Sequence, residues 1–125
     1  MHPSDHRLVA VATGAGLYLS RDAGQRFRAV VEGEQVVSVT FSLDGSSLWF
    51  GSYGDAAKLS RLDLKTREIT PLGVPELDED AIAYLAQNPV QPKEWATATF
   101  KRDVYLSKDA GTTWSAIAKA GQTLE

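Results

Sequence analysis

One short turn sequence occurs twice in this chain, and the duplication restricts the folds that the chain can adopt. The pattern Ser-x-Asp-x-Gly runs from Ser20 to Gly24 and again from Ser107 to Gly111, so the second copy starts 107 − 20 = 87 residues after the first. The residues before each turn also match, because residues 17–20 read LYLS and residues 104–107 read VYLS. Such a duplication predicts a fold built from copies of one supersecondary unit.

A third, degenerate copy lies between these two. His2-Pro3 corresponds to Asn88-Pro89 at a shift of 88 − 2 = 86 residues, and half of this shift is 43 residues. Residues 41–52 match the strand–turn–strand part of the other copies, whereas residues 58–64 have lost the Asp-x-Gly turn. This period is typical of β-propeller blades, which repeat about every 40–50 residues.

Short runs rich in β-branched and aromatic residues, closed by Gly, Asp, Ser and Pro, predict strands throughout the chain. Val37, Val39 and Phe41, for example, alternate with polar residues, as in a half-buried strand. Residues 76–87 are the best helical candidate, but the repeat predicts an inner strand at residues 81–86. The predicted strands lie at residues 8–13, 17–20, 27–31, 36–41, 47–52, 57–63, 67–72, 81–86, 94–99, 103–107 and 113–118.

These strands divide the chain into one partial propeller module with about three blades, at residues 1–33, 34–73 and 74–118, and a tail at residues 119–125. A propeller blade has four strands, so the first unit lacks its innermost strand. Propellers typically close with about 4–8 blades, and three blades would leave sheet faces and edges unpaired. We therefore expect either self-association of two copies into a ring of about six blades or completion by the remainder of a longer chain.

Both turns extend to the pattern Ser-x-Asp-x-Gly-x-x-aromatic, with Phe27 in the first copy and Trp114 in the second. This pattern resembles the Asp-box, or BNR, repeat of a broad group of β-propellers. The group includes sialidases, xyloglucan-degrading glycosidases, sortilin-type receptors and photosystem assembly factors. The resemblance implies an all-β fold with blades of four antiparallel strands, in which each Asp-box forms the turn between the third and fourth strands.

We interpret the residues of both boxes as structural. Ser and Asp side chains can accept hydrogen bonds from nearby backbone N–H groups, Gly permits a positive φ, and the aromatic side chain packs between strands. The alternative is a carbohydrate or ion site at the turn. The residues concerned are Ser20, Asp22, Gly24, Phe27, Ser107, Asp109, Gly111 and Trp114.

Enzymes of this group guide the search for catalytic residues, and no catalytic constellation can be identified. Sialidases share an arginine triad, but we interpret Arg21, Arg26 and Arg28 as exposed residues in or beside the first turn. Glycoside hydrolysis requires two facing carboxylates. The densest acidic cluster, at residues 76–80, is interpreted as a solvated linker between blades, with a site wall or a cation-binding rim as the alternative.

Composition excludes several other kinds of site. The formal net charge of −3 argues against a nucleic-acid partner, and the absence of cysteine excludes thiolate chemistry. His2 and His6 lie in a polar N-terminal segment that is a candidate for disorder, so we predict no metal and no cofactor. Neither a membrane span nor a secretory signal is visible, which makes the cytoplasm the default location, or a secreted or periplasmic one if the sequence is truncated.

The sequence therefore predicts a non-enzymatic β-propeller module that acts as a binding or assembly scaffold for a carbohydrate or protein ligand. The alternative is a fragment or subunit of a glycoside hydrolase propeller. Propellers usually bind ligands at the axial channel or at one rim, through loops between strands, and these loops are the candidate site here. The three tryptophans, Trp49, Trp95 and Trp114, are interpreted as packing residues rather than a sugar platform. The candidate rim residues are Tyr53, Asp55, Asp78, Glu79 and Asp80.

Overall fold

Three antiparallel β-sheets follow one another along the chain in the computed structural model, which describes residues 2–53, 57–72, 82–119 and 122–123. No helix occurs among these residues, so none of them forms a helix that could cross a membrane. The first sheet contains β1 (Val9–Thr13), β2 (Gly16–Ser20) and β3 (Arg28–Glu32). The second contains β4 (Gln35–Phe41), β5 (Ser47–Tyr53), β6 (Ala57–Asp63) and β7 (Ile69–Pro71). The third contains β8 (Ile82–Gln87), β9 (Trp95–Thr99), β10 (Val104–Ser107), β11 (Ser115–Lys119) and β12 (Gln122–Thr123).

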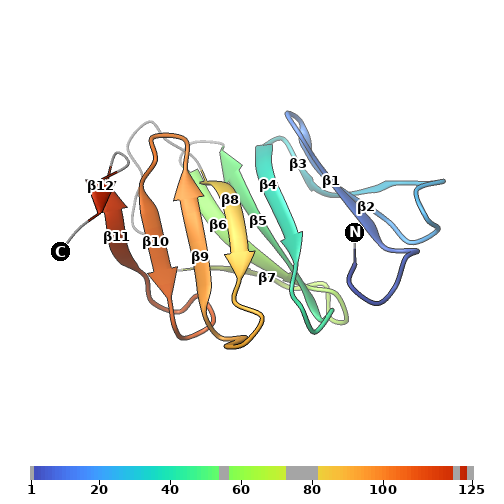
Figure 1. The fold of residues 1–125 in the computed structure, drawn as a ribbon. Helices are drawn as coiled ribbons and strands as arrows, with labels where there is room; N and C mark the ends of the chain where they lie inside the picture. The colour runs from blue at the N-terminus through green and yellow to red at the C-terminus, as the bar shows by residue number, and fades with distance from the viewer. Residues whose placement is uncertain (1, 54–56, 73–81, 120–121, 124–125) are drawn as a thin grey trace.

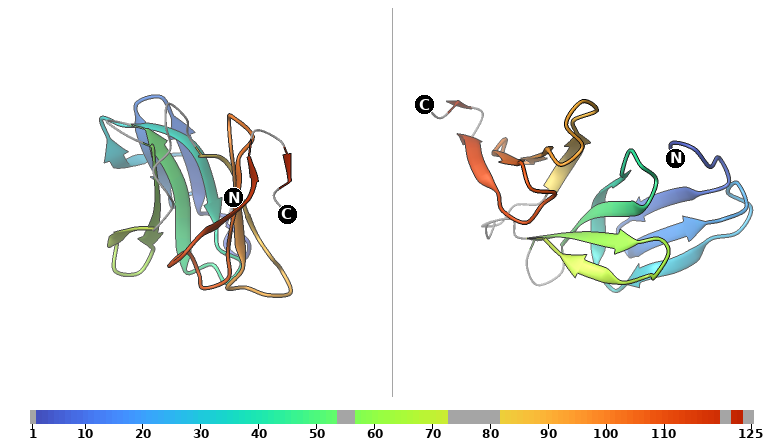
Figure 2. Two further views of the ribbon diagram at one scale, coloured as in Figure 1. Left: turned by 90° about the vertical axis from the view of Figure 1, so that its left-hand side faces the viewer. Right: turned by 90° about the horizontal axis from the view of Figure 1, so that it is seen from below.

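We refer to these sheets as blades 1, 2 and 3. In each blade the strands pair in chain order, as in a meander, and blades 1 and 3 lie on opposite sides of blade 2 (Figure 1). The views from the side and from below show the same succession (Figure 2). Each face of blade 2 can therefore pack against a neighbouring sheet, whereas one face of blade 1 and one face of blade 3 have no neighbour among the described residues.

The prediction of an all-β fold with partial propeller blades is confirmed, including the three-stranded first unit. The helical alternative at residues 76–87 is wrong for its described part, because β8 occupies Ile82–Gln87. No strand is predicted in the tail, but Gln122–Thr123 pairs with β11 at the outer edge of blade 3. The described tail residues therefore extend blade 3 and do not supply the inner strand that blade 1 lacks.

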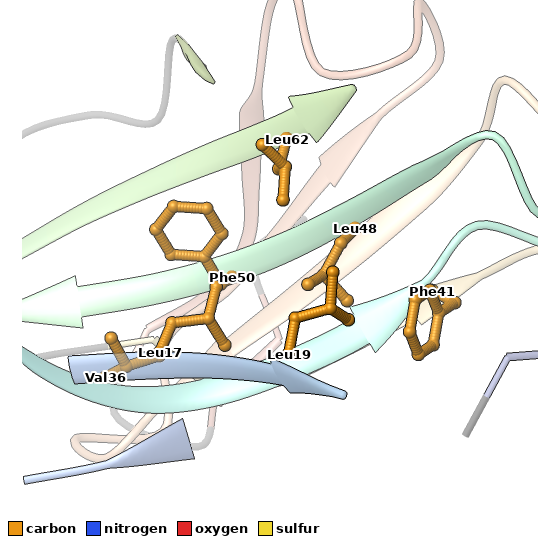
Figure 3. Packing of buried hydrophobic residues seen from close by; sticks show 7 residues of the cluster. All are labelled: Leu17, Leu19, Val36, Phe41, Leu48, Phe50 and Leu62. Atoms are coloured by element: carbon orange, nitrogen blue, oxygen red, sulfur yellow. The ribbon is translucent and has the colours of Figure 1, made fainter. Parts of the chain in front are cut away.

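The core between blades 1 and 2 is aliphatic with two phenylalanines (Figure 3). Leu17 and Leu19 of β2 point toward Leu48 and Phe50 of β5, and all four side chains are buried. Alternation along the strands places these residues on facing sheet surfaces. The remaining buried members are Val36, Phe41 and Leu62.

A second core, between blades 2 and 3, is aromatic. Trp49 of β5 stacks on Trp95 of β9 with ring centroids 3.6 Å apart and an interplanar angle of 11°, and both are 2% exposed. Trp49 lies between Leu48 and Phe50 in sequence, so β5 contributes Leu48 and Phe50 to the first core and Trp49 to the second. The interpretation of Trp49 and Trp95 as packing residues is confirmed. Tyr105 and the half-buried Trp114 complete this core from blade 3.

The register of the blades is interrupted at equivalent places. A shift occurs between Leu17 and Tyr18 in the β2–β3 pair and again between Val104 and Tyr105 in the β10–β11 pair. These positions are 104 − 17 = 87 residues apart, the same spacing as the two turns. Such bulges increase the local twist of a strand, so the same irregularity bends blades 1 and 3.

The N-terminal segment is ordered, contrary to the expectation of disorder. His2 is buried, its Nδ1 accepts hydrogen bonds from the backbone N–H groups of Ser4 and Asp5, and its Nε2 lies 2.7 Å from the carbonyl oxygen of Gly45. In blade 3 the side-chain oxygen of Asn88 accepts the equivalent pair of hydrogen bonds. The imidazole therefore replaces an amide oxygen in the repeated turn, a role that the alignment of His2-Pro3 with Asn88-Pro89 could have revealed.

Candidate functional site: an arginine-lined groove

The two Ser-x-Asp-x-Gly turns have the same hydrogen bonds. Ser20 donates its hydroxyl to Asp22 at 2.8 Å and accepts the backbone N–H of Gly24 at 2.9 Å. Ser107 makes the corresponding contacts with Asp109 and Gly111 at the same distances. The aspartate in turn accepts a backbone N–H four residues on, from Arg26 or Thr113. Both turns connect the third and fourth strand positions of a four-stranded blade, because blade 1 lacks its first strand.

Each turn is also fixed to the segment just before the second strand position of its own blade, which is β1 in blade 1 and β9 in blade 3. The backbone N–H of Ala23 donates to the carbonyl oxygen of Arg7, and that of Ala110 donates to that of Lys93. Ala23 and Ala110 have φ values of 62° and 57°, in the left-handed region that L-residues rarely occupy. Equivalent strain in both copies indicates that this backbone geometry belongs to the repeat rather than to one ligand site.

Two turns of blade 2 are also held by an aspartate side chain that accepts hydrogen bonds from nearby residues, but they lack the Ser-x-Asp-x-Gly pattern. The carboxylate of Asp63 accepts the backbone N–H groups of Lys65 and Thr66 between β6 and β7. Asp44 accepts the hydroxyl of Ser42 and the N–H of Ser46 between β4 and β5, and Gly45 has a φ of 76°. The strand–turn–strand prediction for residues 41–52 is thus confirmed, with its turn at Asp44-Gly45.

These contacts lower the pKa values of the turn aspartates. The pKa of Asp109 is lowered to about 2, chiefly by the hydroxyl of Thr113, then by its N–H and by the hydroxyl of Ser107. The pKa of Asp22 is lowered by the N–H of Arg26 and the hydroxyl of Ser20. Hydrogen bonds that favour the charged carboxylate have this effect, so both turns depend on ionised aspartate.

We expect the stability of the chain to fall as the pH decreases from about 4 to 2. A carboxyl whose pKa is depressed in the folded state stabilises it above the unfolded pKa and loses this contribution as the pH falls through the folded pKa. Asp109→Asn should make the urea midpoint less dependent on pH in this range. Glu68→Gln is the matched amide control outside the two turns. Equal pH dependence in Asp109→Asn and the unmodified chain would contradict the prediction.

A groove of about 560 Å³ opens between the outer strands of blades 1 and 2. Four arginines surround it: Arg21, Arg26 and Arg28 from the first turn and β3, and Arg67 from the β6–β7 turn. Its floor is aliphatic, and Asp22 supplies the single acidic group of the lining. The aliphatic lining residues are Leu19, Ala29, Val30, Leu62, Leu64 and Ile69. The arrangement presents delocalised positive charge around an apolar surface.

This site is only partly visible in the sequence. The interpretation of Arg21, Arg26 and Arg28 as exposed turn residues agrees with their exposure in the structure. No pattern joins them to Arg67, which lies about forty residues away and has a φ of 66°. Spatial proximity of two consecutive blades brings the four side chains to one groove.

The predicted rim site is largely outside the described residues. Tyr53 is described and 37% exposed at the end of β5, whereas Asp55, Asp78, Glu79 and Asp80 lie outside the described part of the chain. Within the described residues, no group of three or more His, Asp or Glu side chains is placed to hold a metal ion.

Comparison with known proteins identifies the fold. No family model and no curated protein matches the sequence. Among solved structures, a GH74 enzyme of Niastella koreensis superposes with a TM-score of 0.70 at 18% identity, over 95% of this chain and 22% of that chain. YCF48 bound to D1 peptide superposes with a TM-score of 0.68 at 20% identity, over 90% of this chain and 37% of that chain. An oligogalacturonate lyase in complex with manganese superposes with a TM-score of 0.69 at 20% identity, over 94% of this chain and 35% of that chain.

These structural neighbours are β-propeller proteins, and this chain spans well under half the length of each. The likeness extends over nearly all of the chain, so it includes all three sheets rather than one blade. Identities of 18–20% establish a common fold and nothing about activity. The chain has the fold of a set of consecutive β-propeller blades.

Proposed function

We propose that this chain is an Asp-box propeller module that serves as a binding and assembly scaffold, and that a second copy covers its two end faces. The observation that carries the proposal is the equivalence of exposed and buried faces along the repeat. We define the leading face of a blade as the one turned toward the preceding blade and the trailing face as the one turned toward the following blade.

The leading face of blade 1 has the pattern of a blade interface. Trp95, Tyr105 and Trp114 of blade 3 pack against blade 2. Their equivalents in blade 1 are Val9, at a shift of 86 residues, and Tyr18 and Phe27, at a shift of 87 residues. Tyr105 is 2% exposed, whereas Phe27 is 43% exposed and Tyr18 is half-buried. Blade 1 thus presents an apolar surface of the kind that blade 3 buries.

The trailing face of blade 3 has the complementary pattern. Leu17 and Leu19 are buried against blade 2, and the equivalent residues in blade 3 are the half-buried Val104 and Leu106. Ala96 and Ala98 repeat Ala10 and Ala12 on the same face. The trailing face of one copy can therefore pack on the leading face of another in the manner of consecutive blades. Two such contacts, related by a two-fold axis, would close a ring of six blades.

The solution mass of the folded chain tests this assembly. We expect 27.2 kDa, twice the 13.6 kDa of one chain, in sedimentation equilibrium. Val11→Glu on the leading face and Tyr84→Glu on the trailing face should each reduce the mass toward that of one chain, because a buried charge disfavours the contact. Val90→Glu is the matched control, since Val90 is 81% exposed in the turn before β9.

Mixing the two variants makes the test more specific. In an equimolar mixture, the trailing face of the Val11→Glu chain meets the leading face of the Tyr84→Glu chain, and this contact is unaltered. The other contact of the mixed pair carries both substitutions, so the pair is held by one intact contact. The mixture should therefore recover dimer that neither variant forms alone. A folded, unmodified chain that stays at 13.6 kDa at all concentrations would overturn closure by a second copy and leave further blades of a longer chain to cover the faces.

The second candidate is a segment of a glycoside hydrolase propeller, which the GH74 neighbour favours. Its hallmark is a pair of facing carboxylates, one of them with a raised pKa. The described aspartates with shifted pKa values have lowered values, and four of them cap turns: Asp22, Asp44, Asp63 and Asp109. Structural roles of these aspartates in turns favour the scaffold function over the hydrolase. Release of reducing sugar from xyloglucan by the purified chain would support the hydrolase instead.

A further inference from the structure

We propose that the arginine-lined groove between blades 1 and 2 binds an acidic polypeptide segment that carries aliphatic side chains. This goes beyond assembly of the module, because the groove lies between two blades of one chain. A volume of about 560 Å³ is in the range of about 300–1,000 Å³ that is usual for ligand pockets.

The repeat shows that the fold does not need these arginines. At the shift of 87 residues, Arg21, Arg26 and Arg28 correspond to Lys108, Thr113 and Ser115. The turn of blade 3 has the same backbone hydrogen bonds with those residues. Guanidinium groups that one copy of a turn replaces with Lys, Thr and Ser without changing its geometry are not required for that geometry. The arginines of blade 1 are therefore available for a ligand.

The four guanidinium groups form no salt bridge within the described residues, and Asp22 is the one acidic residue beside them. The carboxylate of Asp22 is held by the hydroxyl of Ser20 and the backbone N–H of Arg26. Four of the seven arginines of a chain with net charge −3 thus surround one groove. Guanidinium groups bind carboxylates through paired hydrogen bonds, which favours a ligand with several carboxylates.

The aliphatic lining of the groove determines which uncharged groups of a ligand fit it. It consists of aliphatic side chains, including Leu62, Leu64 and Ile69, and contains no aromatic ring. Sugars and nucleobases are commonly bound by stacking on aromatic rings, so an aliphatic body fits this floor better. Ile69 is 45% exposed and would lose water contact when covered. Leu, Val and Ile side chains of a peptide provide such a body.

The backbone beside the groove suits an extended peptide. Arg28, Ala29 and Val30 line the groove and belong to β3, which is the outer edge strand of its sheet. An edge strand offers unpaired N–H and C=O groups to an incoming strand. A peptide that alternates acidic and aliphatic residues would direct its carboxylates to one side and its apolar side chains to the other.

Titration with a labelled peptide of the sequence acetyl-Glu-Leu-Glu-Val-Glu-Leu-amide tests this proposal by fluorescence anisotropy. The matched probe replaces each Glu with Gln and keeps the shape. We expect the acidic peptide to bind at least tenfold more tightly than the Gln peptide and to weaken as salt increases, because screening acts on exposed charges.

Variants locate the binding. Arg26→Gln with Arg28→Gln should raise the Kd of the acidic peptide at least tenfold, whereas Arg102→Gln, in the exposed β9–β10 turn, should leave it unchanged. Circular dichroism of each variant establishes that it folds. Equal binding of both peptides, an equal loss with Arg102→Gln, or no binding would overturn the proposal. Tighter binding of a single-stranded oligonucleotide at the same arginines would also overturn it and assign the groove to nucleic acid.

Discussion

Gly111→Ala is expected to lower the free energy of unfolding by about 2–4 kcal/mol, through backbone strain and overpacking together. Gly111 has a φ of 88°, which disfavours any L-residue. A Cβ there would also lie 2.8 Å from the indole of Trp49 and 3.2 Å from Leu72, both in blade 2. Trp49 stacks on Trp95 and cannot move aside without disturbing the second core. Urea unfolding followed by circular dichroism measures the change.

Gly24→Ala is the matched control, because Gly24 occupies the same position in the first turn. Its φ is 91°, but a Cβ there would meet only the ring of Phe27, at 4.0 Å. We expect a loss of about 1 kcal/mol, from backbone strain alone. The difference between the two variants isolates the contact with the preceding blade. Equal losses would show that the turn, rather than its packing against blade 2, determines the requirement for glycine.

Trp49→Ala is expected to destabilise the chain more than any of the other substitutions, by about 3–5 kcal/mol. The substitution leaves a cavity opposite Trp95 and removes the hydrogen bond from the indole N–H to the hydroxyl of Ser47 at 3.2 Å. A loss of this size is a large part of the total stability of a typical domain, about 5–15 kcal/mol. Urea unfolding should show it as a lower midpoint, and near-ultraviolet circular dichroism should lose the signal of the stacked indoles.

Phe27→Ala provides the control for an aromatic side chain outside the closed cores. Phe27 is 43% exposed, so its removal should cost less than about 1 kcal/mol in a monomeric chain. If the leading face of blade 1 is covered by a second copy, Phe27→Ala should instead weaken that association. A cost for Phe27→Ala as large as that for Trp49→Ala in the monomer would contradict the division into closed and open faces.

The sequence predicted the strands well because each blade obeys local rules. Alternation of Val37, Val39 and Phe41 and the turn at Asp44-Gly45 are properties of a few adjacent residues. The register shift between Val36 and Ser38 nevertheless places Val36, and not Val37, in the first core. The repeat also indicates which face of a blade each side chain occupies, since the equivalence of Tyr18 with Tyr105 can be read from the sequence alone. The packing roles of the tryptophans in β5 and β9 were predictable for the same reason.

The features that the sequence did not predict depend on contacts between segments that are distant along the chain. The burial of His2 requires the carbonyl oxygen of Gly45, which belongs to blade 2. The groove requires Arg67 to approach Arg26 and Arg28 across a blade boundary. The strand Gln122–Thr123 forms because β11 offers a free edge, and its polar composition carries no strand signal. The repeat indicates which face of a blade is buried, but it does not indicate which individual residues of distant segments come into contact.

The repeated bulges at Leu17–Tyr18 and Val104–Tyr105 have a consequence for how such a protein can change in length. Because blades 1 and 3 carry the same bulge and each copy has its own pair of faces, the contacts at one junction do not depend on how many copies precede it. Duplication or deletion of a gene segment that encodes one whole copy would preserve every remaining junction. Gain or loss of whole copies therefore leaves the remaining junctions intact, and the angle at each junction sets the number of blades that close one ring.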